Sequence, residues 1–119
     1  MWVLIIDDVV SNTFFMSEAV KSLNHRAVVS HDAGAALALL DQMEFDCIIV
    51  DFHMPNINGS AFLTSLRTKR STSGRTIPVL VMTADTSPDL VTEVKNLGAL
   101  TVLHKPIGIS VLGAALDSL

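Results

Sequence analysis

The chain has 119 residues, of which 50% are hydrophobic and 17% are charged, so it is long enough for one domain with a sizeable core. Its formal net charge of −4 argues against a nucleic-acid-binding domain, because such domains usually carry a basic surface. Its one cysteine, Cys47, excludes an internal disulfide and a cysteine-rich zinc site, and we expect it to be a small buried hydrophobic residue.

The first apolar run of the chain covers residues 1–6 and stops at Asp7 and Asp8. It is too short for the apolar part of a signal peptide, and no basic residue precedes it. No other apolar run approaches the length of a membrane span. We therefore expect no membrane span and a reducing compartment, most simply the cytoplasm.

Short apolar runs alternate with longer amphipathic segments along the chain. The runs are rich in Val, Ile and Leu and do not alternate with polar residues, which is typical of strands buried on both faces of a parallel sheet. In chain order, the predicted strands are residues 3–6, 27–29, 47–50, 79–82 and 100–103.

The segments that follow these runs have apolar residues at helical spacing. Asp32 and Ser87 followed by Pro88 predict helix starts, whereas Asn24 and Gly98 predict left-handed helix ends. The five apolar stripes are Phe15, Met16, Ala19, Val20 and Leu23, then Ala33, Ala36, Leu37, Leu40 and Met43, then Phe62, Leu63 and Leu66, then Leu90, Val91, Val94 and Leu97, and finally Val111, Leu112, Ala115, Leu116 and Leu119.

The longest break in this pattern is the polar segment 67–78. It contains Arg67, Lys69, Arg70 and Arg75. We predict a solvated loop, and the alternative is a patch that docks a partner.

Five strands alternating with five helices predict a single α/β domain over residues 1–119, with helices on both faces of an open sheet. Sites in such sheets form at the carboxyl ends of the strands. Polar residues follow four of the predicted strands at that edge: Asp7 and Asp8, Asp51, Thr83, and His104 with Lys105.

Three carboxylates at one edge repel one another unless a cation lies between them. Mg²⁺ prefers oxygen ligands and leaves room for a phosphate oxygen, and a lysine and a hydroxyl can bind further phosphoryl oxygens. The set therefore predicts phosphoryl transfer onto a carboxylate, with Asp51 as the nucleophile.

Over nearly its whole length the chain resembles the receiver domain of response regulators in two-component signalling. Residues 8–12 also resemble receivers attached to hybrid histidine kinases. The matching motifs are the acidic pair Asp7-Asp8, the phosphoacceptor Asp51 with Met54-Pro55 and Gly59 downstream, the switch pair Thr83-Ala84, and Lys105 followed by Pro106, whose peptide bond is cis in this family.

The resemblance implies a doubly wound, flavodoxin-like (βα)5 domain with parallel strands in the order 2-1-3-4-5. It implies that Asp8, Asp51 and the backbone carbonyl of His53 bind Mg²⁺ and that Asp7 acts through a bound water. Lys105 would pair with Asp51 and, after phosphorylation, with the phosphoryl group.

The resemblance also implies a signalling function. Asp51 would accept a phosphoryl group from a histidine kinase or a histidine phosphotransfer protein, and Thr83 would move toward it and switch a protein-interaction surface. Such a domain catalyses only its own phosphorylation and dephosphorylation, binds an unidentified downstream protein, and makes no direct contact with nucleic acid.

Two positions depart from the family pattern. A Tyr or Phe whose ring rotates usually stands where this chain has Val102, so the resemblance leaves open how the signal departs from the site. The other position is His53, which with Asp85 borders the path of hydrolytic water in the family. We predict that both side chains set the lifetime of the phosphorylated state.

The histidines have alternative roles to weigh. His53 could be a metal ligand or a phosphorelay histidine, but no second His or Cys stands at metal spacing, so we expect an exposed side chain that binds no metal. We expect His25, His31 and His104 at the surface or at strand edges.

Two other functions remain as alternatives. One is a magnesium phosphohydrolase with a nucleophilic aspartate, but such enzymes commonly have a second aspartate where this chain has His53, and often a lid domain. The other is a degenerate receiver used only for binding, which would typically lack an acid or the lysine, and this chain lacks neither.

Overall fold

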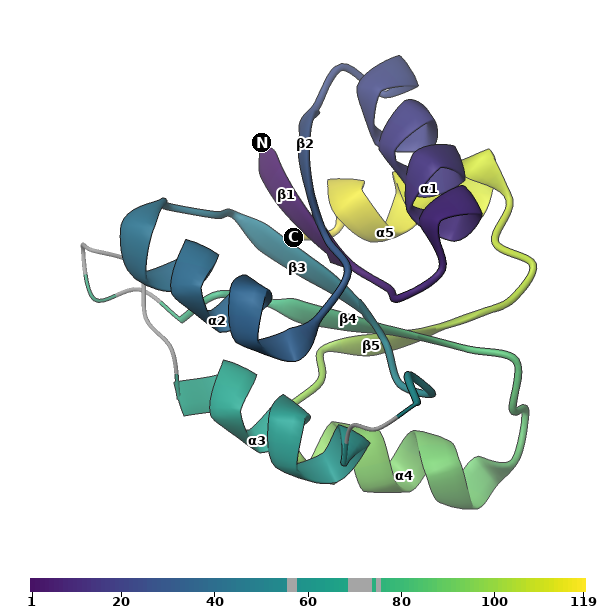
Figure 1. The fold of residues 1–119 in the computed structure, drawn as a ribbon. Helices are drawn as coiled ribbons and strands as arrows, with labels where there is room; N and C mark the ends of the chain where they lie inside the picture. Colours follow the sequence, from purple (N-terminus) through teal and green to yellow (C-terminus); the bar gives the residue numbers. More distant parts are fainter. Residues whose placement is uncertain (56–57, 69–73, 75) are drawn as a thin grey trace.

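The computed structural model describes residues 1–119 apart from 56–57, 69–73 and 75. Within the described residues, five strands form one sheet (Figure 1). Their bounds are Trp2–Ile6 (β1), Arg26–Ser30 (β2), Cys47–Asp51 (β3), Val79–Thr83 (β4) and Thr101–His104 (β5).

A helix follows each strand, as the alternating pattern predicts. The helices are Val10–Ser22 (α1), Ala33–Gln42 (α2), Gly59–Thr68 (α3), Pro88–Asn96 (α4) and Ile109–Asp117 (α5).

All neighbouring strands are parallel, and their order is β2-β1-β3-β4-β5, so the predicted flavodoxin-like topology is confirmed. After β1 the chain moves to one side to form β2 and then crosses to the other side to form β3. The crevice at the carboxyl ends of β1 and β3 is therefore the switch point where ligands bind in open α/β sheets.

The core consists of two apolar clusters, one on each face of the sheet. Helices α1 and α5 lie on one side of the sheet, and α2, α3 and α4 lie on the other (Figure 1). On one face α1 and α5 pack through Met16, Val20, Leu112 and Leu116. On the other face α2, α3 and α4 supply the apolar side chains. The central strands are buried on both faces, which explains their unbroken apolar sequences.

Cys47 lies at the start of β3 and is fully buried, as predicted. Burial raises the pKa of its thiol to about 12, and the nearby charge of Asp46 adds to the shift. The thiol is therefore neutral at physiological pH, and Cys47 acts as a small core side chain.

The predicted helix boundaries are confirmed at four positions. The side chain of Asp32 accepts a hydrogen bond from the backbone N–H of Ala35 at 2.7 Å, and Ser87 caps α4 in the same way. Asn24 and Gly98 adopt φ angles of 67° and 110° just after their helices. A side chain at Gly98 would also collide with Arg67.

Four predicted strands end one residue too early. The last residues of these strands are Ser30, Asp51, Thr83 and His104. The backbone ladder continues beyond the apolar run, because the N–H of Lys105 donates to the carbonyl of Thr83 at 2.8 Å. Leu100 was also placed wrongly in a strand: it precedes β5 and is exposed.

Three residues of the predicted apolar stripes lie outside the core. Phe15 and Val111 are exposed because α1 and α5 turn other residues toward the sheet, and Leu119 is exposed beyond the end of α5. Periodicity alone does not fix the width of a buried stripe, so residues at its margin were wrongly included.

The predicted loop 67–78 is shorter than expected, because α3 continues through Thr68 and Ile77 is buried. Lys69, Arg70 and Arg75, the other cations of the suggested docking patch, lie outside the described residues. Among the helices in the described ranges, none is long and apolar enough to cross a membrane.

Candidate functional site

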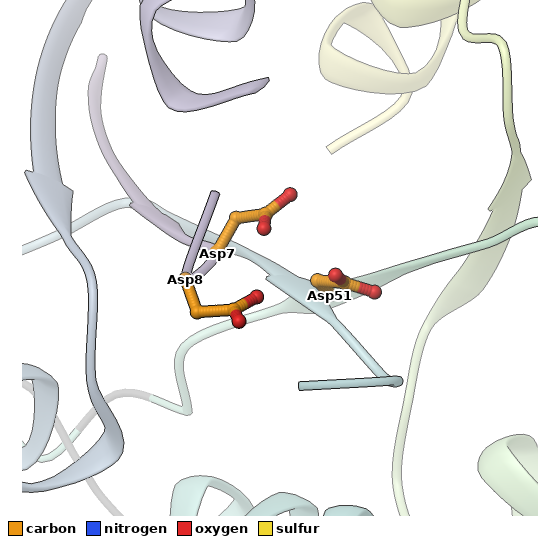
Figure 2. Close-up of side chains that lie close together, drawn as sticks. All are labelled: Asp7, Asp8 and Asp51. Atoms are coloured by element: carbon orange, nitrogen blue, oxygen red, sulfur yellow. The ribbon is translucent and has the colours of Figure 1, made fainter. Parts of the chain in front are cut away.

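Three carboxylates meet at the carboxyl ends of β1 and β3. Ligand oxygens of Asp7, Asp8 and Asp51 all lie within 4.8 Å of one another (Figure 2). The side chain of Asp7 is fully buried, and that of Asp51 is 7% exposed. Such a concentration of negative charge at low exposure is compatible with a bound metal cation.

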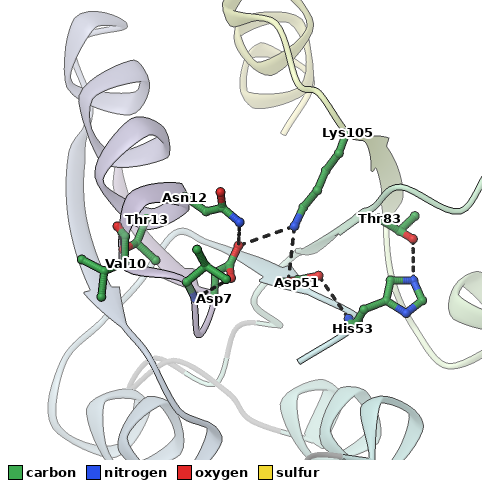
Figure 3. Close-up of polar contacts among 9 residues, drawn as sticks. Asp7, Val10, Asn12, Thr13, Asp51, His53, Thr83 and Lys105 are labelled. Carbon is green, nitrogen blue, oxygen red and sulfur yellow. Dashed lines mark hydrogen bonds and ion pairs between the residues drawn. The ribbon is translucent and has the colours of Figure 1, made fainter. Parts of the chain in front are cut away.

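Asp7 is held by three partners. Its Oδ1 accepts a hydrogen bond from the backbone N–H of Val9 at 3.0 Å, and its Oδ2 accepts one from Nδ2 of Asn12 at 3.2 Å (Figure 3). Nζ of Lys105 lies 3.6 Å from the same Oδ2. These contacts tie the end of β1 to the first turn of α1 and fix the direction of the Asp7 carboxylate.

Lys105 is the cation of the site. Its Nζ lies 3.3 Å from Oδ2 of Asp51 as well as near Asp7, so one ammonium bridges two carboxylates (Figure 3). The peptide bond from Lys105 to Pro106 is cis, as the resemblance implies. Three carboxylates against one ammonium leave a formal charge of −2 (one minus three), which matches a divalent cation.

The two oxygens of Asp51 have different partners. Oδ2 faces Lys105, whereas Oδ1 accepts a hydrogen bond from the backbone N–H of His53 at 3.1 Å. Asp51 is the last residue of β3, and the backbone at His53 has already turned back toward its side chain.

The hydroxyl of Thr83 lies at the end of β4 and is fully buried. Its Oγ1 is 2.7 Å from Nε2 of His53 (Figure 3). The same Oγ1 accepts a hydrogen bond from the backbone N–H of Asp85 at 3.0 Å. In the described part of the chain, the hydrogen-bond partners of this hydroxyl are therefore His53 and Asp85, and Asp51 is not among them.

Asp85 continues this network toward α4. Its Oδ1 accepts a hydrogen bond from the backbone N–H of Ser87, the cap of α4, at 2.8 Å. The hydrogen bonds from Ser87, first from its backbone and then from its side chain, lower the pKa of the Asp85 carboxyl, and the nearby imidazoles of His53 and His104 act in the same direction.

The predicted site residues therefore fall into two groups. Asp7, Asp8, Asp51 and Lys105 come together, whereas Thr83 is engaged by the side chain of His53. His53 is exposed, as expected, but its contact with Thr83 was not predicted, because the two residues are thirty positions apart in the chain. The pairing of Asp51 with Met82 brings the two residues together, and their contact depends on this register and on the rotamer of His53.

The other histidines and Val102 lie as follows. His104 is exposed and His25 is half-buried near the N-terminal amine, as expected. His31 is exposed too, but its Nε2 lies 2.9 Å from Oγ1 of buried Thr13, a contact that the sequence did not indicate. Val102 is half-buried and packs with the core residues beside α4.

An open groove adjoins the acidic cluster, between α1 and the segment after β5. Its volume is about 460 Å³. It is lined by Asp7, Asn12, Phe15, Met16, Met82, Ala84, Lys105, Pro106 and Ile107. The groove was not predicted from the sequence, because Phe15, which lines it, has the helical spacing of a core residue.

Comparison with known proteins gives a consistent result. A family model described as "Response regulator receiver domain" matches residues 3–117. The sensor histidine kinase AruS of Pseudomonas aeruginosa is 33% identical over 114 residues, which cover 96% of this chain. The chain spans only 11% to 15% of the length of such sensor proteins.

Solved structures agree with this match. The chemotaxis protein CheY4 of Vibrio cholerae superposes with a TM-score of 0.88 and 30% identity, covering 98% of this chain and 96% of that one. The receiver domain of the sensor histidine kinase PA1611 from Pseudomonas aeruginosa superposes with a TM-score of 0.84 and 21% identity, over 98% of this chain and 94% of that one. In that structure a magnesium ion is coordinated in the active-site cleft.

Proposed function

The chain belongs to the family of response regulator receiver domains, and from this premise we propose that it is a phosphoacceptor in two-component or phosphorelay signalling. In this proposal Asp51 takes a phosphoryl group from a phosphohistidine of a histidine kinase or a histidine phosphotransfer protein. The observation that carries the proposal is the pairing of Asp51 with Lys105 beside two further carboxylates.

Asp51 is the acid best placed to be the nucleophile. Asp7 is fully buried and held by three partners, whereas Asp51, at the carboxyl end of β3, is slightly exposed. In the transfer, an Oδ atom of Asp51 forms the new P–O bond, and the P–N bond to the donor imidazole breaks with its electron pair going to nitrogen. Lys105 already lies beside Asp51 and can neutralise the charge of the arriving phosphoryl group.

The acidic cluster fits Mg²⁺, because its donors are all oxygens and its uncompensated charge is −2 (one minus three). We assign Asp8, Asp51 and the backbone carbonyl of His53 as its ligands, with Asp7 acting through a water. The bound ion would supply charge neutralisation for the phosphoryl oxygens.

The partner would dock on the outer side of α1. Phe14 and Phe15 are 67% and 60% exposed there, beside Val10 and the groove that leads to Asp7 and Lys105. An exposed apolar helix face next to a reaction site suits the apolar face of a partner helix that carries the phosphohistidine. Replacing Phe14 by Glu should slow transfer from a protein donor and leave phosphorylation by a small molecule unchanged.

We propose a signalling role and not a turnover enzyme. The position where an aspartyl phosphohydrolase would commonly have its second aspartate holds His53, whose side chain contacts Thr83. After transfer, Thr83 and Lys105 would bind the phosphoryl group, and this would bias a protein-binding surface built on β4 and β5. The cytoplasm is the proposed location, since phosphohistidine donors are made from ATP.

The test is incubation of the whole chain with Mg²⁺ and phosphoramidate, followed by intact mass measurement. We expect one phosphoryl adduct on the native chain and on Asp117→Asn, which alters an exposed acid of α5, and none on Asp51→Ala. An unmodified native chain, or an equal adduct on Asp51→Ala, would overturn the proposal.

A further inference from the structure

One residue connects the phosphoacceptor to the switch hydroxyl. The backbone N–H of His53 binds Oδ1 of Asp51 at 3.1 Å, and the ring of the same residue binds Oγ1 of Thr83 at 2.7 Å. Figure 3 shows the imidazole turned away from Asp51 and toward Thr83. Modification of the Asp51 carboxylate can therefore alter the hydrogen bond of Thr83 through one intervening residue, His53.

The hydrogen bonds of Thr83 restrict what its hydroxyl can do. A hydroxyl has one donor hydrogen and two lone pairs, and the N–H of Asp85 already occupies one lone pair at 3.0 Å. The imidazole takes either the hydrogen or the second lone pair, depending on its tautomer. When Nε2 accepts the hydrogen, the hydroxyl must give up His53 before it can donate to a group on Asp51, whereas an imidazole that donates would leave that hydrogen free.

Val102 cannot serve as the moving part of such a switch. Its side chain is short and half-buried, and it packs against the core beside α4. The ring of His53 is exposed and touches the edge of Phe52, with centroids 5.5 Å apart and planes at 87°. An exposed ring held at one end by a single hydrogen bond is free to move once that bond is lost.

We propose that His53 is the ring that moves when this domain switches. In the unmodified state Nε2 of His53 accepts the hydrogen of the Thr83 hydroxyl and so keeps that hydrogen from any group on Asp51. When Asp51 is phosphorylated, Thr83 turns to a phosphoryl oxygen and the imidazole is released toward solvent. The inference rests on the proposed function, since it requires that Asp51 be phosphorylated.

The chain contains a matched pair for comparison. Nε2 of His31 lies 2.9 Å from Oγ1 of Thr13, so an exposed imidazole again contacts a buried threonine. That pair joins the segment after β2 to α1 and includes no residue of the acidic cluster. Phosphorylation should therefore release His53 and leave His31 unchanged.

The first test is NMR of the whole chain with labelled histidine, with Mg²⁺ present and before and after phosphoramidate, at one fixed pH. We expect the ring signals of His53 to shift and those of His31 to stay. In Thr83→Val, the ring signals of unmodified His53 should already lie near their phosphorylated position.

The second test is a double-mutant cycle on the rate of phosphorylation by phosphoramidate. His53→Ala should raise the rate about five-fold. The substitution removes one hydrogen bond of the unmodified state, so the state in which the hydroxyl of Thr83 faces Asp51 costs about 1 kcal/mol less to reach. His53→Gln, which keeps a polar group near Thr83, should restore the native rate, and His31→Ala should not change it. In a Thr83→Val background, His53→Ala should have no effect.

Two outcomes would overturn the inference. One is an adduct on Asp51 with unshifted His53 signals, and the other is an effect of His53→Ala that persists in Thr83→Val. Both would leave the proposed function standing, because the mass adduct would still form. Absence of any adduct would instead remove the proposed function and the inference together.

Discussion

The two halves of the carboxyl edge of the sheet are built differently. On the side of β1 and β3, charged groups lie close together at low exposure, and Lys105 bridges Asp7 and Asp51. On the side of β4, Thr83 makes hydrogen bonds to a ring nitrogen of His53 and to the backbone N–H of Asp85, and both of these residues are exposed. The charged half is fixed from several directions, whereas the polar half can rearrange by exchanging one or two hydrogen bonds.

Because of this difference, we expect acceptance of a phosphoryl group and transmission of the signal to depend on different residues of this domain. Charge pairs in a partly desolvated site are stronger than neutral hydrogen bonds. Substitutions in the charged half should therefore change whether the domain is phosphorylated. Substitutions in the polar half should mainly change what the domain does afterwards.

The largest effect is expected for Lys105→Ala. Loss of the ammonium leaves the arriving phosphoryl charge without its protein cation, so we expect phosphorylation by phosphoramidate to slow about 100-fold or more. The measurement is the rate of adduct formation, followed by intact mass. Lys95→Ala, which changes an exposed lysine of α4, is the control. A rate within a few-fold of the native value would show that the charged half does not govern acceptance.

Asp8→Asn should weaken Mg²⁺ binding by about ten-fold or more, because it removes one proposed carboxylate ligand. Without Mg²⁺ the same change should raise the free energy of unfolding by about 1 kcal/mol, because it relieves repulsion from Asp7 and Asp51. Calorimetric titration with MgCl₂ and urea unfolding measure the two effects. A fall in the free energy of unfolding without Mg²⁺, together with weaker Mg²⁺ binding, would mean that Asp8 stabilises the fold itself.

Thr83→Ala tests the polar half. We expect the phosphorylation rate to change by about ten-fold at most, since only a neutral hydrogen bond to the phosphoryl group is lost. The free energy of unfolding should fall by about 1–2 kcal/mol, since the substitution removes buried hydrogen bonds of Thr83. A rate loss as large as that of Lys105→Ala would abolish the distinction between the two halves.

The smallest effect concerns the pH dependence of the polar half. The pKa of Asp85 is lowered in the folded chain, so its carboxylate stabilises the fold above its ordinary value of 3.8, and this stabilisation is lost as pH falls through the lower, folded pKa. The free energies of unfolding of the native chain and of Asp85→Ala, measured with urea, should differ at pH 6 and converge as the pH falls through the folded pKa of Asp85, below 3.8. A difference in the free energy of unfolding that stays constant with pH would mean that the charge of Asp85 does not strengthen its hydrogen bonds with Ser87.

The sequence predicted the fold well, because unbroken apolar runs and helix caps such as Asp32 and Ser87 are local signals. It also placed the acidic cluster correctly, since parallel strands carry their terminal residues to one edge. It could not predict the bond between His53 and Thr83, which depends on the register of β3 and β4 and on one rotamer. It also misjudged Phe15, because amphipathic spacing gives the direction of a helix face and not its width.

The buried thiol of Cys47 gives the domain a built-in reporter of its own opening. It lies at the start of the strand that ends in Asp51, and burial raises its pKa to about 12, so a thiol reagent can modify it only in molecules whose sheet has opened. Any ion or group that binds the acidic cluster only while the sheet is intact will slow that modification, because binding stabilises the folded state. The rate at which this single cysteine is labelled thus measures, from the amino end of the strand, how firmly the site at its other end is occupied.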